Sequence, residues 1–90
     1  METIYKGSGW EIYINLEAAV VSACLYSKAT KQSMELRLNG SSDNSHNFML
    51  SGNETAELGV GMYDLEIYAY DSIVDVKNNF VKVVETSKSN

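Results

Sequence analysis

The feature that most constrains the fold is a two-residue alternation of apolar and polar side chains. Between residues 10 and 16 the apolar positions are Trp10, Ile12, Ile14 and Leu16, and residues 63–69 repeat the pattern. Successive side chains of a β-strand point to opposite faces of its sheet, so this period predicts strands that bury one face. The chain is therefore expected to be built from strands.

Further short strands are predicted by the same alternation or by runs of β-branched residues. They lie at residues 19–26, 34–38, 48–50, 73–76 and 80–85. In the first of these, Val21, Ala23 and Leu25 share one face. About seven short strands separated by turn signals predict an all-β, two-sheet antiparallel β-sandwich.

The segments between these strands predict loops and turns. Residues 39–47 are rich in Asn and Ser and predict a long polar loop, and residues 77–79 predict a tight hairpin because Asn tolerates left-handed backbone. Residues 51–58 predict a helical turn with Asn53 as its N-cap and with Ala56 and Leu58 pointing inward. Tyr63 follows a Gly-rich turn, so it is either a tyrosine corner or an ordinary buried tyrosine.

Length and charge narrow the class of protein. The chain has 90 residues, which is the size of one domain, expected at residues 1–86 with a short polar tail at residues 87–90. Its net charge is −5, which disfavours binding to nucleic acid or to an anionic membrane surface, since both require cations. One cysteine excludes an internal disulfide, and the first residues predict no signal peptide, so synthesis in a cytoplasm is expected.

No arrangement of residues in the sequence predicts catalysis, a metal site or a cofactor. His46 is the only histidine and lies in the polar loop, where an exposed position is expected, while Cys24 lies mid-strand and is expected to pack as a small hydrophobe. The carboxylates at positions 64, 66, 71 and 75 lack the spacing of a calcium loop and predict a solvated outer face. We therefore expect a protein that is not an enzyme.

The remaining candidates for function are aromatic side chains on the surface. Tyr13, Tyr68 and Tyr70 are expected to project opposite the apolar stripes, and with Trp10 they are the candidate protein-interaction residues. Exposed tyrosine is enriched where proteins meet, because the ring buries a large area while its hydroxyl stays hydrated. The alternative is that these rings cover the second side of a small sandwich.

Two segments resemble a known family. Residues 6–14, Lys-Gly-Ser-Gly-Trp-Glu-Ile-Tyr-Ile, and residues 54–68, which contain Leu-Gly-Val-Gly-Met-Tyr-Asp-Leu-Glu-Ile, are similar to the small immunoglobulin-like domains of tailed-bacteriophage virions, including those of crAss-like phages. The chain departs from the baseplate members at residues 16–19, which are apolar, and it lacks their long C-terminal extension.

The resemblance implies an immunoglobulin-like fold and a structural function. The expected role is an auxiliary, or decoration, capsid protein that binds the major capsid protein in a virion assembled in a bacterial cytoplasm. A tail or baseplate adaptor that binds other tail subunits is the first alternative. A carbohydrate- or peptide-binding module is the second, and a bacterial cell-surface domain is the third. The resemblance implies no catalytic residues.

Overall fold

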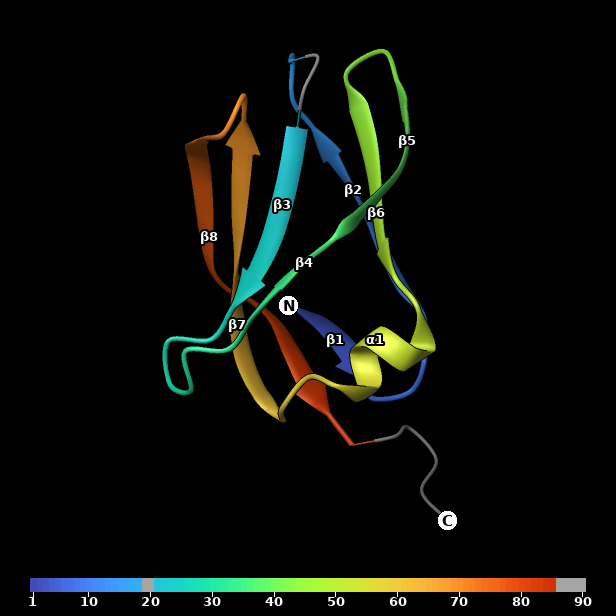
Figure 1. Ribbon diagram of the computed structural model, residues 1–90, viewed down its shortest axis with the longest axis vertical. Helices are drawn as coiled ribbons and strands as arrows, with labels where there is room; N and C mark the ends of the chain where they lie inside the picture. The colour runs from blue at the N-terminus through green and yellow to red at the C-terminus, as the bar shows by residue number, and fades with distance from the viewer. Residues whose placement is uncertain (19–20, 86–90) are drawn as a thin grey trace.

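The computed structural model describes residues 1–18 and 21–85, which form eight strands and one short helix (Figure 1). The elements are β1 (Glu2–Tyr5), β2 (Trp10–Asn15), β3 (Val21–Tyr26), β4 (Ser33–Glu35), β5 (Arg37–Ser42), β6 (Ser45–Leu50), α1 (Gly52–Ala56), β7 (Gly61–Ala69) and β8 (Ser72–Val84). The predicted tail at residues 87–90 and the first two residues of the strand predicted at 19–26 lie outside the described residues.

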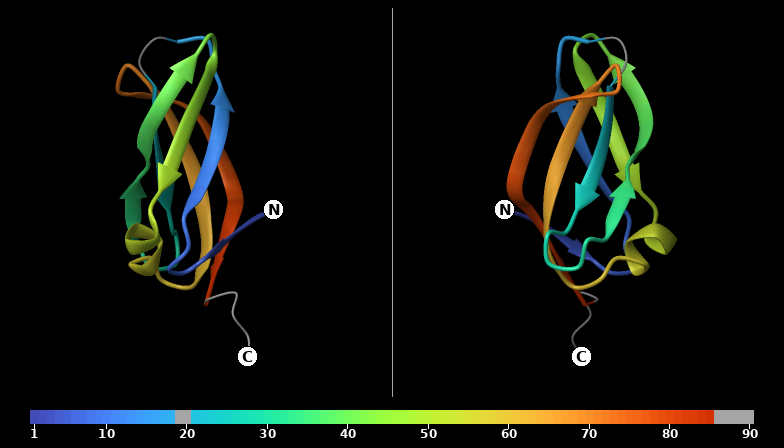
Figure 2. Two further views of the ribbon diagram at one scale, coloured as in Figure 1. Left: turned by 90° about the vertical axis from the view of Figure 1, so that its right-hand side faces the viewer. Right: turned by 60° about the vertical axis from the view of Figure 1, so that its left-hand side comes forward.

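The strands form two sheets packed face to face, as Figure 2 shows from two sides. Sheet A has the order β1-β8-β7-β3-β4 and sheet B has the order β2-β6-β5. The prediction of an all-β, two-sheet protein is confirmed. The expectation that every pairing is antiparallel is wrong, because β1 runs parallel to β8 and makes sheet A mixed.

The strand number also differs from the prediction of about seven. β1 was not predicted because Ile4 is its only buried residue, so it carries almost no alternation. The segment predicted as one strand at 34–38 is two short strands in different sheets, β4 and β5. Leu36 lies between them and is buried in the core, so it holds the chain where it crosses from sheet A to sheet B.

The predicted polar loop at residues 39–47 is wrong, because most of it is a hairpin. β5 and β6 pair down to Ser42 opposite Ser45, and Asp43 adopts a positive φ of 54° in the turn. Short polar residues such as Asp tolerate this left-handed conformation. Polar composition alone therefore misidentified strands whose exposed residues happen to be Ser and Asn.

The predicted hairpin at residues 77–79 is also wrong, because β8 continues through it. The hairpin between β7 and β8 turns instead at Tyr70 and Asp71, whose φ values are 51° and 69°. Asn79, with a φ of 52°, belongs to an irregularity of the β7–β8 ladder opposite Asp64. Asn tolerates the left-handed backbone as expected, but at a bulge within β8.

The helix begins two residues earlier than predicted. Ser51, not Asn53, is the N-cap: its side chain accepts a hydrogen bond from Glu54 N, and the Glu54 carboxylate accepts one from Ser51 N at 2.7 Å. This reciprocal arrangement is a capping box, which satisfies two backbone donors of a helix too short to be stable alone. Ala56 is exposed rather than inward, whereas Leu58 is buried as predicted.

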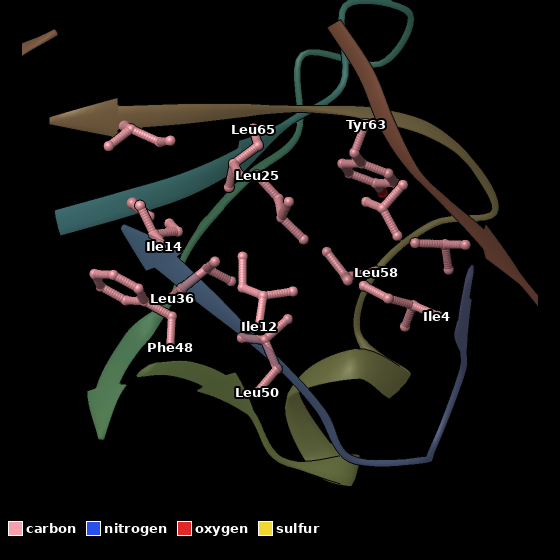
Figure 3. Close-up of a cluster of buried hydrophobic side chains, with 14 of the residues drawn as sticks. Ile4, Ile12, Ile14, Leu25, Leu36, Phe48, Leu50, Leu58, Tyr63 and Leu65 are labelled. Atoms are coloured by element: carbon pink, nitrogen blue, oxygen red, sulfur yellow. The ribbon is translucent and has the colours of Figure 1, made fainter. Parts of the chain in front are cut away.

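The core lies between the two sheets and is continuous from β2 to β8 (Figure 3). The alternation predicted for β2, β3 and β7 is confirmed, since their buried apolar residues are the ones that the period selects; Asp64 of β7 is the one buried residue that departs from it. The largest buried apolar side chains are Tyr63, Phe48, Ile4, Leu25, Leu50, Leu58 and Leu65. They come from both sheets and from the segment after α1, so the core ties the sandwich together.

Tyr63 makes the contact expected of a tyrosine corner. Its ring is buried, and its hydroxyl lies 2.8 Å from the carbonyl oxygen of Gly59 and 2.8 Å from Gln32 Oε1, so its one proton is donated to either acceptor. Burial raises the pKa of the Tyr63 hydroxyl. Gln32 also accepts a hydrogen bond from Gly59 N, which fixes the turn into β7 from two directions.

Candidate interaction surface

The outer face of sheet A is apolar near the β7–β8 hairpin. Tyr68 pairs with Ile73 across the hairpin, and Val76 lies opposite Glu66, so these side chains share the face that points away from the core. Ile73 is 53% exposed and Val76 is 41% exposed. We name this surface the hairpin face: Tyr68, Ile73 and Val76, with Tyr70 at the hairpin tip.

Tyr70 holds an unusual backbone position at that tip. It is 61% exposed, and both it and Asp71 have positive φ values, as in the type I′ turns that usually contain Asn or Gly. A left-handed conformation costs an ordinary residue about 1–2 kcal/mol. The chain thus keeps a large exposed aromatic ring at a position where a smaller residue would be more stable.

Carboxylates surround the hairpin face and are not neutralised by cations. Among the described residues Glu35, Glu66 and Asp71 make no ion pair. The Tyr68 hydroxyl donates to Glu66 Oε1 at 3.1 Å, and this hydrogen bond, with the negative charge of Glu66, raises the pKa of Tyr68. The face is therefore both aromatic and negatively charged.

A shallow hollow of about 390 Å³ lies beside Tyr68 on the same face. It is lined by Ser22, Cys24, Ser33, Glu35 and Asp71. Cys24 is half-buried at its floor, and partial burial, together with nearby carboxylates, raises the pKa of its thiol. Cys24 was expected to pack as a small hydrophobe, but it lies on the outer face of β3 and is not part of the buried core.

The outer face of sheet B is more polar and its side chains bond to one another. Tyr13 projects from β2 and is 66% exposed, as predicted. Asn47 opposite it donates to Ile12 O and to Glu11 Oε1, and accepts from Asn39 Nδ2. Tyr13 therefore lies in the sheet opposite to Tyr68, and the two do not form one patch.

Trp10 lies apart from the three tyrosines. It is half-buried at the start of β2, where its ring packs against the core. Its Nε1 is buried and has no hydrogen-bond partner among the described residues. The four candidate residues are thus distributed over both sheets, and only Tyr68 and Tyr70 come together.

One side of the sandwich is open where two strand edges face solvent. β2 is an edge strand of sheet B, and β1 covers β8 only from Val81 to Val84, so within residues 1–18 and 21–85 only β7 pairs with the segment 72–79 of β8. We name residues 72–79 the free edge. The left view of Figure 2 shows β2 and β8 on this side. A groove of about 490 Å³ lies between them, with Ile14, Ile67 and Val74 among its walls.

The free edge was not predicted as a functional feature. Asp75 and Lys77 lie opposite Ile67 and Leu65, so both charges point toward the groove, and their side chains form an ion pair of 3.2 Å. The sequence feature that could have indicated this irregular edge is the break of alternation at Val74. Val74 is an extra residue that the β7–β8 ladder accommodates as a bulge.

His46 is not exposed, contrary to prediction. It is 2% exposed and lies opposite Ile14 on the inner face of β6. Its Nε2 is 2.9 Å from the Leu16 carbonyl oxygen and its Nδ1 is 2.8 Å from Ser41 Oγ. Because a carbonyl only accepts, Nε2 donates to Leu16 O, and Nδ1 is hydrogen-bonded to the Ser41 hydroxyl. His46 thus joins the ends of β2 and β5, in the sheet opposite to Cys24.

The four carboxylates considered for calcium are separated by the fold. Asp64 is buried rather than solvated; it accepts a hydrogen bond from Asn79 N at 2.8 Å and pairs with Lys28 at 3.6 Å. Asp75 instead points toward the groove. Among residues 1–18 and 21–85 no group of three potential metal ligands gathers.

No helix in the described part of the chain is long and apolar enough to span a membrane. Comparison of the chain with protein-family models, with curated proteins and with solved structures finds no match in any of the three.

Proposed function

We propose that the chain is a non-enzymatic structural protein of a tailed-bacteriophage virion, an immunoglobulin-like module that binds other virion subunits. The observation that carries the proposal is the hairpin face, where aromatic and aliphatic side chains are exposed among unpaired carboxylates. A surface of this kind suits contact with a protein partner, since tyrosine is enriched among the residues that supply most of the binding energy at interfaces.

The order of the strands supports an immunoglobulin-like topology. β2-β6-β5 has the order B-E-D, and β8-β7-β3-β4 has the order G-F-C-C′ of variable-type domains. The Tyr63–Gly59 hydrogen bond lies at the start of β7, where a tyrosine corner lies in such domains. β1 corresponds to the first strand, placed here at the edge of sheet A and parallel to β8.

The negative charge of the hairpin face favours a partner surface that is positively charged. Glu35, Glu66 and Asp71 favour a neighbouring subunit that presents lysine or arginine around an apolar centre. In a virion many copies bind a repeated lattice, so a modest affinity for each contact is sufficient. We propose the capsid shell as that lattice, with a tail or baseplate position as the alternative.

The test measures whether the chain belongs to the particle. We expect it in virions purified by density-gradient centrifugation, and we expect added purified protein to co-sediment with particles that lack it. Tyr70→Asn should weaken this binding at least tenfold while raising the stability of the fold, because Asn suits the left-handed turn position. Tyr13→Asn, on the opposite sheet, is the matched control and should bind normally.

Two results would contradict the proposal. Absence of the chain from purified virions would exclude the virion role. Loss of binding in Tyr13→Asn but not in Tyr70→Asn would assign the contact to sheet B.

A carbohydrate-binding module is the second candidate, because Tyr68 borders a hollow lined by the hydroxyls of Ser22 and Ser33 and by two carboxylates. Sugars stack on aromatic rings while their hydroxyls bind such polar groups. Specific hits on a glycan array, lost in Tyr68→Ala, would favour this function over the virion role.

A further inference from the structure

We propose that the free edge of β8 pairs with the same edge of a second copy, in one antiparallel register centred on Val76. The pairing would join the two copies of sheet A into one continuous sheet around a two-fold axis. This inference does not depend on the proposed virion role, because it rests on the backbone edge of β8 and on the charges of Asp75 and Lys77.

The free edge has backbone groups available for pairing. Ser72, Ile73 and residues 75–77 pair with β7 on one side, with bulges at Val74 and near Asn79, whereas among the described residues β1 covers the other side only from Val81 onward. Backbone N–H and C=O groups along such an edge are a template for another strand. Ile73, Val74 and Val76 add exposed β-branched side chains along this edge, which favour strand pairing.

Charges select a second copy as the partner. In an antiparallel pair centred on Val76, Asp75 of each copy lies directly opposite Lys77 of the other. Directly opposed residues share a face, with Cβ atoms about 4.5–5.5 Å apart, so the two charges meet. The ion pair within each copy and the two pairs between copies then form a closed network of alternating charge on the groove side.

The same charges penalise other registers. A shift of two residues places Asp75 opposite Asp75, or Lys77 opposite Lys77, and like charges directly opposite each other are destabilising. A shift of one residue turns every side chain of the incoming strand to the other face. A single inward-pointing charge usually protects an edge strand from pairing. Two opposite charges two residues apart still exclude most strands, but they accept a strand that carries the complementary charges.

The apolar side chains fit the same register. Val76 meets Val76 of the other copy on the outer face. On the groove side, Val74 lies two residues from the two-fold axis, so part of the open groove is covered. The available edge is short, and we expect it to bury less than the roughly 800 Å² per partner of a standard interface, so the dimer should form reversibly at high concentration.

Charge exchange tests the register directly. Sedimentation velocity from about 10 µM to 1 mM should show a monomer–dimer equilibrium for the wild-type chain. Asp75→Lys and Lys77→Asp should each remove dimerisation, because each places like charges opposite each other. A mixture of these two variants should form a heterodimer, and the double variant that exchanges both charges should dimerise as the wild type does.

Lys82→Asp is the matched control, since it makes the same change of charge on β8 where β1 already covers the strand. It should leave dimerisation unchanged. The proposal is overturned by a wild-type chain that stays monomeric at 1 mM, or by single variants that dimerise normally. Failure of the two folded single variants to associate when mixed would also overturn the proposal. In that mixture, every charge at position 75 or 77 of one variant faces the opposite charge on the other. Circular dichroism of each variant checks the folding.

Discussion

The two halves of β8 differ in almost every respect although they belong to one strand. In the lower half, Val81 and Val83 are fully buried and the strand pairs with β7 on one side and β1 on the other. In the upper half, the free edge, every residue is exposed and only β7 is paired. Both halves are rich in valine, so the difference comes from what the rest of the chain places beside them.

The base of the sandwich is closed by contacts that converge on the lower half. Thr55 of α1 is fully buried; its Oγ1 accepts from Gly7 N at 3.0 Å and donates to Ser8 O at 2.8 Å. Gly52 lies so close to Gly7 that an added Cβ would be 2.5 Å from the Gly7 carbonyl oxygen. The loop after β1 is thereby held against the helix, which fixes β1 beside β8. Among the described residues, no equivalent contacts close the upper half.

The comparison separates a closed region of β8 from an open one. The closed region carries buried side chains and satisfied hydrogen bonds, while the open region, which we propose binds a second copy, keeps exposed apolar groups and a backbone edge. Substitutions that are alike in chemistry should therefore differ in effect according to the half in which they lie.

The largest expected difference is between two valine-to-alanine substitutions in β8. Val83→Ala should lower the free energy of unfolding by about 2–3 kcal/mol, because it removes buried methyl groups and leaves a cavity. Val74→Ala should change it by less than about 0.5 kcal/mol, since the side chain is half exposed. Urea denaturation of both variants measures the difference. Equal losses would show that the free edge is packed as firmly as the base.

The next effect tests the hydrogen bonds that close the base. Thr55→Val keeps the shape of the side chain but removes the hydroxyl, so Gly7 N and Ser8 O lose their partner, and a loss of about 1–3 kcal/mol is expected. Thr3→Val, at an exposed position of β1, is the control and should be nearly neutral. Equal unfolding midpoints for the two variants would contradict a stabilising role of the Thr55 hydroxyl.

Much of the fold could be predicted from the sequence, because burial on one face leaves a local period. The alternation in β2, β3 and β7 identified their inward residues and placed Tyr68 and Tyr13 on outer faces. What could not be predicted depends on partners distant in sequence. His46 was expected to be exposed because Asn and Ser surround it, yet the register of β6 with β2 places it inside.

The candidate site shows the same limit. The turn of the last hairpin was predicted at residues 77–79, where the Asn pair lies, whereas the ladder turns at Tyr70, a residue that turn propensities disfavour. The free edge was not predicted, because a strand with one covered side and a strand with two have similar local sequences. Only the pairing of β1 with residues 81–84 separates them.

A smaller effect is expected at the corner that leads into β7. Tyr63→Phe keeps the buried ring but removes the hydroxyl that lies 2.8 Å from Gly59 O and from Gln32 Oε1, and a loss of about 1 kcal/mol is expected. Tyr26→Phe, a half-buried tyrosine of β3, is the control. If thermal unfolding shows that Tyr63→Phe loses no more stability than the control, Tyr63 is an ordinary buried tyrosine and not a tyrosine corner.

The smallest expected effect depends on pH and concerns the cap of α1. The Ser51 backbone N–H and Arg37 hold the pKa of Glu54 below its usual value of 4.5, because both bind its carboxylate. A depressed pKa means that the charged carboxylate stabilises the fold above pH 4.5, and that this contribution is lost as the pH falls through the lower folded-state pKa. Glu54→Gln should therefore lower the urea midpoint slightly at pH 7, and the two chains should converge as the pH falls below the folded-state pKa of Glu54. Glu57→Gln, which removes a carboxylate without an ion pair among the described residues, should not show this convergence. A difference between wild type and Glu54→Gln that stays constant with pH would mean that the cap acts through the shape of the side chain and not through its charge.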